Sequence, residues 1–300
     1  MKMVMYFCLK EHLKLIMKKK SMLPKCASDW SAFVFTICGV PSICVFELMW
    51  VLPNFYNFEH EIVKASIHSF NGIFILINVL GNLCKIFTTD ISSGSFVMPS
   101  TLQKNWRFCP VCEANSPPRS YHCNICGICV LRRDHHCTFT GCCIGFHNYR
   151  YYYMFLFHLT IGALYATIFN MPVIFALLGG FNLFNVMIHI FPVATWLVGY
   201  IDYKLLIWIS LSSVCGYVFI FGTVLMFYHA TFFLKGQTAF EKSKNIETYC
   251  YGSWKDHVVD YFGSRWYFVW VFPSIHSPIL GDGIHFMTKD KYLTDSAKNQ

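Results

Sequence analysis

The chain has 300 residues, of which 55% are hydrophobic, 18% aromatic and only 13% charged. A soluble domain of this size carries about a quarter of its residues as charges, so the composition excludes an ordinary soluble protein and indicates a membrane protein. The formal net charge is +8, and much of the excess lies in short segments rather than in one basic tail. This pattern suits membrane orientation and anionic head groups better than nucleic-acid binding.

Four stretches of the chain are long and apolar enough to cross a bilayer, which takes about 20 residues. They cover residues 31–52, 66–87, 151–178 and 205–234. The preceding residues 1–30 contain a short apolar segment broken by Glu11, no convincing signal-cleavage site, and the cluster Lys18, Lys19 and Lys20. We expect this part to be an amphipathic, basic segment at the cytosolic membrane surface.

A fifth apolar stretch, residues 181–200, complicates the topology. Counted as a span, it would place the lysine cluster near the N-terminus and the basic tail that begins at Lys235 on opposite sides of the membrane. With four spans, both basic segments and residues 88–150 share one face, and the 53–61 loop, which has no Lys or Arg, lies on the other. We therefore predict a lumenal or re-entrant loop at about 181–200.

The predicted fold is an α-helical integral membrane protein with four transmembrane helices and a cytosolic cysteine-rich domain between helices 2 and 3. Helices 1 and 2 fall within residues 31–88, and helices 3 and 4 within residues 151–234. The cytosolic parts are residues 1–30, the domain at 89–150 and the tail at 235–300. Eight of the 15 cysteines lie between residues 109 and 143.

The cysteines and histidines of this domain have the spacing of metal ligands. Residues 109–129 read CPVCEANSPPRSYHCNICGIC, in which cysteines recur as C-x2-C pairs. Such pairs form the tight turn that wraps one zinc ion, and structural zinc sites take four Cys or His ligands. Cytosolic thiols stay reduced, so the pattern favours zinc over disulfides.

Two tetrahedral zinc sites need eight ligands, and residues 109–129 supply six. The other two must come from the run RRDHHCTFTGCC, residues 132–143. This run offers five candidates, which are His135, His136, Cys137, Cys142 and Cys143. More candidates than vacancies exist, so some of these side chains are not ligands, and spacing alone does not choose between them.

Residues 109–148 follow the pattern C-x2-C-x9-HC-x2-C-x2-C-x4-DHHC-x5-C-x4-N. On this pattern, and on its place between the second and third of four spans, the chain resembles the DHHC family of protein S-acyltransferases (palmitoyltransferases). The resemblance implies two interleaved structural zinc ions. Their ligands would be Cys109, Cys112, His122 and Cys129 for the first, and Cys123, Cys126, His136 and Cys143 for the second.

The resemblance also implies that Asp134, His135 and Cys137 form the catalytic group. A thiolate bound to zinc is a poor nucleophile, so the reactive cysteine must lie outside the metal sites. His135 would accept the proton of Cys137, and Asp134 would orient His135. Cys137 would take the acyl group of a long-chain acyl-CoA, palmitoyl-CoA in particular, and pass it to a cysteine of a protein substrate.

Three neighbouring residues are expected to contact acyl-CoA. Arg132 and Arg133 offer charges to CoA phosphates or to lipid head groups, and an anchoring role for them at the membrane surface stays open. The family commonly has Pro-Trp after the DHHC cysteine, where this chain has Thr138 and Phe139. Phe139 still offers an aromatic face to the acyl chain.

Other positions depart from the family pattern or need a separate assignment. Residues 238–241 read TAFE in place of Thr-Thr-x-Glu, and Ala239 lacks the hydroxyl that contacts the DHHC aspartate in relatives. His257 stands where the C-terminal element usually has an asparagine. Cys142 is interpreted as a non-ligand, because only Cys143 has the family spacing.

Taken together, these features predict a multi-pass membrane enzyme of the endoplasmic reticulum or Golgi whose active site faces the cytosol. Its partners would be acyl-CoA, the lipid bilayer and membrane-associated proteins with cytosolic cysteines. Nucleic acid is excluded, since the cysteine-rich block lacks a basic recognition helix. The alternative is a weakly active or inactive relative that acts as a membrane-tethered zinc-domain scaffold, which Ala239 keeps open.

Overall fold

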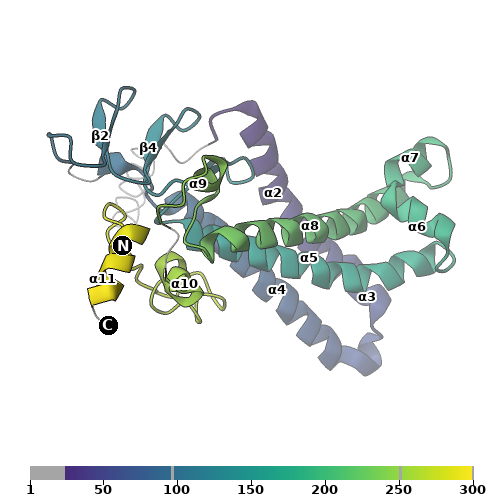
Figure 1. The fold of residues 1–300 in the computed structure, drawn as a ribbon. Helices are drawn as coiled ribbons and strands as arrows, with labels where there is room; N and C mark the ends of the chain where they lie inside the picture. Colours follow the sequence, from purple (N-terminus) through teal and green to yellow (C-terminus); the bar gives the residue numbers. More distant parts are fainter. Residues whose placement is uncertain (1–23, 96–97, 250–251, 299–300) are drawn as a thin grey trace, which may run out of the picture.

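The computed structural model describes residues 24–95, 98–249 and 252–298. Long helices form a bundle, and a small lobe that contains all the strands of the described chain lies at one end of it (Figure 1). The amphipathic segment expected around Lys18, Lys19 and Lys20 lies outside the described residues.

Four helical segments of the described chain are long and apolar enough to cross a membrane, which confirms the predicted four-helix membrane fold. The first is composite: α2 (Ala27–Phe46) continues through a π-helical turn (Glu47–Val51) into α3 (Leu52–Phe55). The other three are α4 (Phe58–Thr88), α5 (Tyr149–Leu177) and α8 (Tyr203–Phe233).

Side-chain caps mark where two of these helices begin. The Asn57 side chain accepts a hydrogen bond from the Glu59 N–H at the start of α4, and Asp202 accepts one from the Leu205 N–H at the start of α8. Such caps satisfy amide groups that the first helical turn leaves without partners. Both caps lie at the end of the bundle that faces away from the strands (Figure 1).

The apolar stretch at 181–200 forms two short helices, α6 (Leu183–Ile190) and α7 (Pro192–Leu197). With eight and six residues, neither reaches the length of about 20 residues that a span needs. His189 Nε2 lies 2.9 Å from Ser212 Oγ, which ties α6 to α8. The pair of helices closes the end of the bundle opposite the strands (Figure 1).

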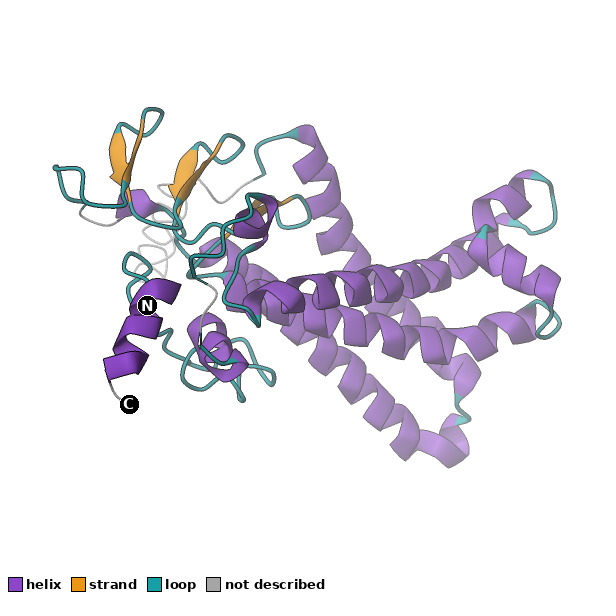
Figure 2. Cartoon of the chain, in the orientation of Figure 1, coloured by secondary structure: helices purple, strands orange, loops and turns teal. Residues whose placement is uncertain are grey.

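The segment between α4 and α5 begins with a single 3₁₀ turn (Ser93–Ser95) and then folds into three antiparallel hairpins, whose visible strands are orange in Figure 2. Their strands are β1 (Arg107–Cys109) with β2 (Ala114–Ser116), β3 (Tyr121–Cys123) with β4 (Ile128–Val130), and β5 (His135–Cys137) with β6 (Cys142–Ile144). Gly127 and Gly141 turn the second and third hairpins with φ of 69° and 63°, a conformation that glycine adopts without strain.

The third hairpin is fixed directly to the membrane bundle. Asn148 is the last residue of the Cys/His sequence pattern and directly precedes α5. Its side chain is fully buried and hydrogen-bonds back to β6. Its side chain donates to the Cys143 carbonyl at 3.0 Å and accepts from the Gly145 N–H at 2.9 Å. The strand that carries the DHHC residues is therefore held at a set position above α5.

The C-terminal tail packs on the same end of the bundle as the hairpins. It contains α9 (Ala239–Ser243), α10 (Trp254–Phe262) and α11 (Lys289–Lys298). Tyr261 and Phe262 of α10 join Tyr149, Tyr153 and Phe233 in one buried cluster, which also contains Cys137, Cys142 and Ile144 of the third hairpin. Hairpin, tail and bundle thus share a single hydrophobic core at this end.

Candidate active site and metal-binding clusters

Adjacent Cys and His residues of the hairpins point to opposite faces of their strands. Successive side chains of a β-strand alternate between its two faces. On β3, His122 and Cys123 are therefore separated, and on β5 His136 is separated from His135 and Cys137. Cross-strand pairing brings Cys129 opposite His122, and Cys143 opposite His136.

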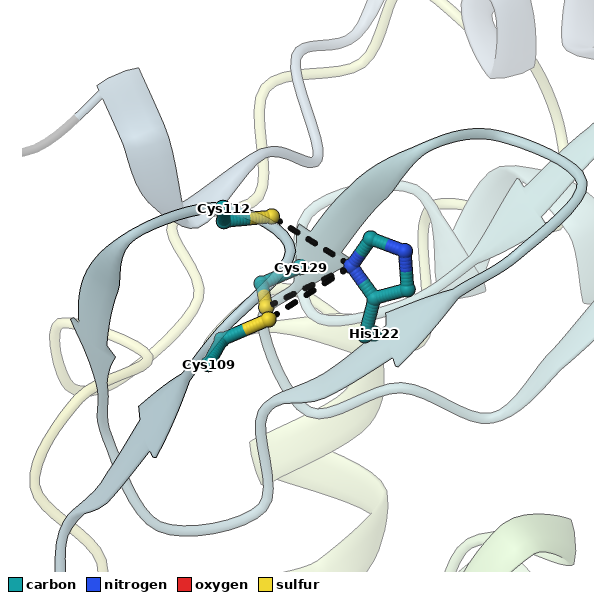
Figure 3. Close-up of side chains that lie close together, drawn as sticks. All are labelled: Cys109, Cys112, His122 and Cys129. Carbon is teal, nitrogen blue, oxygen red and sulfur yellow. Dashed lines mark hydrogen bonds between the residues drawn. The ribbon is translucent and has the colours of Figure 1, made fainter.

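The first cluster joins the first and second hairpins. It consists of Cys109, Cys112, His122 and Cys129, whose ligand atoms all lie within 4.8 Å of one another. The three sulfur atoms converge on His122 Nδ1 at 3.7, 3.3 and 4.0 Å (Figure 3).

The second cluster joins the second and third hairpins. It consists of Cys123, Cys126, His136 and Cys143. Here the sulfur atoms lie 3.8, 3.3 and 3.7 Å from His136 Nδ1. The two clusters share the second hairpin, so their ligands alternate along the sequence.

Both clusters fit zinc in donor type and in spacing. Ligands bound to Zn²⁺ at about 2.0–2.3 Å in a tetrahedral site lie about 3.4–3.8 Å from each other. The distances to the histidine nitrogens fall close to this range, and the sulfur atoms of Cys126 and Cys143 are 3.6 Å apart. Three thiols and one imidazole are a common donor set of structural zinc sites.

A carboxylate on a membrane helix orients the histidine of the second cluster. Asp29 of α2 is 1% exposed, and its Oδ2 accepts a hydrogen bond from His136 Nε2 at 2.9 Å. This contact leaves Nδ1 for the metal, and such carboxylate partners fix the tautomer and the ring orientation of metal-binding histidines. Sequence reasoning missed Asp29, because a single acidic residue before an apolar stretch has no distinctive pattern.

The opposite face of β5 carries a different arrangement of groups. His135 Nδ1 donates to Asp134 Oδ2 at 2.7 Å, and the Cys137 thiol lies close enough to the same ring for the two groups to shift each other's pKa. Asp134 and Cys137 are buried, whereas the His135 side chain is a quarter exposed. The structure thus brings Asp134, His135 and Cys137 together outside both metal clusters.

The electrostatics of this group favour a charged Cys137–His135 pair. Burial opposes the charge on His135, but the hydrogen bonds to Asp134 and Cys137 outweigh it and raise the pKa of His135 to about 9. Burial likewise raises the pKa of Cys137, and the hydrogen bond and charge of His135 reverse this effect and lower it. The pKa of Asp134 is lowered despite burial, chiefly by His135. A thiolate is the nucleophilic form of cysteine.

The main chain of α9 supplies the contact to Asp134 that the Ala239 side chain lacks. The Ala239 N–H donates to Asp134 Oδ1 at 2.9 Å. The capping box of α9 holds this N–H in place, since the Glu241 carboxylate accepts from the Thr238 N–H and pairs with Arg119 at 2.6 Å. Asp134 therefore still accepts a hydrogen bond from the segment that lacks the hydroxyl, through the Ala239 N–H.

A second histidine, His229 of α8, also faces Asp134. It is 4% exposed, and its Nδ1 lies 3.6 Å from Asp134 Oδ2. Its Nε2 lies 3.0 Å from the Tyr152 hydroxyl. Its position in an apolar span was visible in the sequence, but its contact with the DHHC aspartate depends on how α8 packs.

Cys137 opens onto an apolar cavity of about 250 Å³ between the four long helices. Phe139 and Tyr152 line the cavity near Cys137, and His68 and Tyr165 line it deeper in the bundle. Nearly all of the lining surface is apolar. A cavity of this kind suits a long hydrocarbon chain whose reactive end lies at Cys137.

The other predicted contact residues differ in their surroundings. Phe139 is partly exposed and lies 5.9 Å, between ring centroids, from Phe221 on the cavity wall. Arg133 donates to the His122 carbonyl and is partly exposed. Arg132, by contrast, is 3% exposed and stacks on Tyr261, and it lines a second cavity of about 180 Å³ together with Arg119 and His257.

Cys142 and His257 are buried outside the two clusters. The Cys142 thiol lies 3.7 Å from the Thr140 hydroxyl, and burial raises the pKa of Cys142 to about 12. Cys142 is absent from both four-residue metal clusters. His257 of α10 packs against Gly236, whose lack of a Cβ atom leaves room for the imidazole ring.

Comparison with known proteins gives consistent results. Residues 102–246 match the family model described as DHHC palmitoyltransferase. The chain is 34% identical over 258 residues to the probable palmitoyltransferase ZDHHC24 of Danio rerio. The aligned region covers 85% of this chain and 87% of that protein. It is also 34% identical to the Homo sapiens protein of the same name, over 72% of this chain and 76% of that protein. Palmitoyltransferase ZDHHC9 of Bos taurus is 45% identical over 64 residues, 21% of this chain and 18% of that protein.

Proposed function

Because this chain belongs to the DHHC palmitoyltransferase family, we propose that it is a protein S-palmitoyltransferase. It moves a long-chain acyl group from acyl-CoA, through an S-acyl intermediate on Cys137, to cysteines of membrane-associated proteins. The observation that carries this proposal is the position of Cys137, which contacts His135 and opens onto an apolar cavity between the membrane helices.

The reaction consists of two thioester exchanges. The Cys137 thiolate attacks the carbonyl carbon of acyl-CoA, a bond from Cys137 sulfur to that carbon forms, and the bond from carbon to the CoA sulfur breaks. The CoA thiolate takes the proton held by His135. In the second exchange, His135 accepts the proton of the substrate thiol, the substrate sulfur attacks the acyl-enzyme, and the Cys137 thiolate leaves.

Asp134 acts on this reaction through His135. Its Oδ2 accepts from His135 Nδ1, so the other ring nitrogen is the one that faces Cys137. Asp134 also stabilises the imidazolium form of His135, which exists whenever Cys137 is a thiolate. The Ala239 N–H and the α9 capping box keep the carboxylate in this pose.

The cavity fits the acyl chain in length and polarity. On α5 its lining runs from Tyr152 to Ala166, which corresponds to a rise of about 21 Å along the helix. The hydrocarbon core of a bilayer is about 30 Å thick and holds two layers of lipid chains, so one such chain extends about 15 Å. Transfer of a 16-carbon chain from water to an apolar environment is favourable by about 12 kcal/mol, at ~0.8 kcal/mol per methylene. An apolar cavity provides such an environment for the chain.

Two zinc ions are proposed as structural groups. The first would be held by Cys109, Cys112, His122 and Cys129, and the second by Cys123, Cys126, His136 and Cys143. When bound, zinc would cross-link the three short hairpins and so stabilise the lobe. The chain's own residues carry every step of the acyl transfer.

We further propose that the hairpins at 89–150, the tail at 235–300 and the N-terminal residues 1–30 face the cytosol, and that the 181–200 segment is lumenal. This proposal is supported by the arrangement of the chain, in which the strands and α9, α10 and α11 lie at one end of the four long helices and α6 and α7 lie at the other end. We propose residence in the endoplasmic reticulum or Golgi on the basis of the family resemblance. Arg133, which is partly exposed beside the site, is the better candidate for a CoA phosphate contact.

The proposal is tested by incubation of the purified protein with labelled palmitoyl-CoA. We expect hydroxylamine-sensitive label on the parent and on Cys142→Ser, and none on Cys137→Ser. Zinc content by mass spectrometry should be equal in all three proteins, which would show that the loss of label is chemical. An unlabelled parent with a full zinc content would support the scaffold alternative. The hydrogen bond from the Ala239 N–H to Asp134 supports the enzyme over that alternative.

A further inference from the structure

A third group of metal-ligating side chains lies between the DHHC strand and α8. Asp134, His135 and His229 each present one ligand atom, and these atoms lie within 4.8 Å of one another. His135 Nδ1 is 2.7 Å and His229 Nδ1 is 3.6 Å from the same carboxylate oxygen, Asp134 Oδ2. Neither of the two four-residue clusters contains any of these three residues.

His229 is the member of this group whose hydrogen bonding is incomplete. Its Nε2 has a partner in the Tyr152 hydroxyl, but Nδ1 is buried and has no hydrogen-bond partner in the part of the chain that the structure describes. Buried polar atoms nearly always have a partner, and an exception needs an explanation. The nearest charged atom is Asp134 Oδ2, so the open lone pair or N–H of His229 points toward the centre of the group.

We propose that Asp134, His135 and His229 form a third metal site, which takes a divalent transition-metal ion such as Zn²⁺ and thereby inhibits the enzyme. Two imidazoles and one carboxylate are a donor set that zinc and related ions bind. Three protein ligands leave one position for water, as in exchangeable sites, whereas the two clusters of four are closed. The His135 side chain is a quarter exposed, whereas Asp134 and His229 are buried, so His135 forms the outer edge of the group.

Inhibition follows from which nitrogen of His135 the metal would occupy. The hydrogen bond to Asp134 uses Nδ1, which leaves Nε2 as the ring nitrogen available to Cys137. A metal on Nδ1 displaces the proton from that nitrogen and leaves the remaining ring proton on Nε2. His135 can then no longer accept the proton of Cys137 or of a substrate thiol. The inhibitory part of this inference rests on the proposed acyltransferase function, and the metal-binding part does not.

Metal stoichiometry tests the site without reference to activity. The full-length protein, purified in detergent, is dialysed against a mild chelator and then titrated with Zn²⁺, and bound zinc is measured by mass spectrometry. We expect two firmly held ions and a third that exchanges. His229→Phe and the milder His229→Asn should lose only the third. His189→Phe is the matched control. His189 is a buried histidine of α6, its Nε2 lies 2.9 Å from Ser212 Oγ, and α6 lies at the end of the bundle opposite the strands (Figure 1).

Acylation measured in the same samples tests the inhibition. Each protein is compared with its own rate before metal addition, so a lower basal rate in a variant does not affect the result. The third ion should lower labelling of Cys137 by about a hundredfold in the parent and in His189→Phe, because a general base contributes about 10²–10⁴ in rate. It should change labelling less than twofold in the His229 variants.

Two results would overturn the proposal. The first is a parent that binds only two ions, or His229 variants that still bind three. The second is a third ion that binds as expected and leaves labelling unchanged, which would remove the inhibitory role. Failure of the proposed function is seen separately, as a metal-free parent that takes up no label at all.

Discussion

The second and third hairpins of the cysteine-rich lobe are built alike and differ in what their two faces meet. The first strand of each contains two adjacent residues of ligand type, His122 with Cys123 and His135 with His136, and strand alternation sends the two to opposite faces. In the second hairpin both faces meet a metal cluster. In the third, one face meets a metal cluster and the other meets Asp134 and the apolar cavity.

The difference comes from where each hairpin lies. Cys137, Cys142 and Ile144 of the third hairpin belong to the core that includes Tyr149 of α5 and Phe233 of α8. The second hairpin packs in a separate small cluster, in which Val130 lies against Ile91. The same strand pattern faces two Cys/His clusters in the second hairpin. In the third hairpin, which packs on the helix bundle, it faces one such cluster and the group of Asp134, His135 and Cys137.

The difference between the second and third hairpins is tested most directly by substituting members of the two adjacent pairs. His122→Ala, Cys123→Ala and His136→Ala should each lower zinc content from two ions to one and abolish acylation, because loss of one ligand opens a structural site. His135→Ala should keep both ions. Mass spectrometry of the native protein counts the metal. Retention of two ions in Cys123→Ala, or loss of one in His135→Ala, would contradict the assignment of faces.

The catalytic face of the third hairpin is tested by activity at constant metal content. We expect His135→Ala to lower the rate of labelling of Cys137 by about a hundredfold or more, because a general base contributes about 10²–10⁴. Label uptake from palmitoyl-CoA under single-turnover conditions measures this rate. A rate within threefold of the parent would show that Cys137 is activated without His135.

The role of the membrane helix in the second metal site is tested at Asp29. Asp29→Ala removes the carboxylate that accepts from His136 Nε2. Loss of such a partner typically costs about 10–100-fold in metal affinity or activity. Competition with a zinc chelator should show faster loss of one ion than in the parent, and Asp29→Asn, which keeps an acceptor oxygen, should lie between the two. Identical zinc loss in all three proteins would rule out this role.

The contact between α9 and the catalytic face is tested by Ala239→Pro, which removes the N–H that bonds Asp134. Ala239 is the first residue of α9 after its N-cap, a position where proline fits, and Thr238 before it is extended with φ −94° and ψ 160°. A hydrogen bond to a charged group is worth about 1.5–3 kcal/mol, so labelling should fall by roughly tenfold or more. Ala239→Ser keeps the N–H and serves as the control. Equal labelling rates in the two variants would show that the Ala239 N–H does not hold Asp134 in position.

The smallest effect is expected at Cys142, the cross-strand partner of Cys137. It is buried among apolar groups and belongs to neither metal cluster. Cys142→Ala should keep two zinc ions and change labelling less than twofold, as seen in a parallel time course. Loss of one zinc ion from Cys142→Ala would show that Cys142, and not Cys143, is the ligand.

Several features of the site could be predicted because they are local. The spacing of Cys and His from 109 to 143 reflects tight turns and cross-strand pairs, which involve residues a few positions apart. Strand alternation also explains why the adjacent residues His135 and His136 have different surroundings. The contact of the Ala239 N–H with Asp134 could not be predicted from residue types, since every residue except proline has that donor.

By itself, the sequence determined the four membrane helices, because apolar length is a property of single segments. The spacing of Cys and His indicated metal ligands, and their division into two groups of four came from the resemblance to a family pattern. The tertiary structure decided which distant groups complete the site. Asp29 reaches His136 across 107 positions, and His229 reaches Asp134 from the fourth span. These contacts depend on how α2 and α8 pack against the lobe and against α5, and packing between distant helices has no signature in the sequence around either residue.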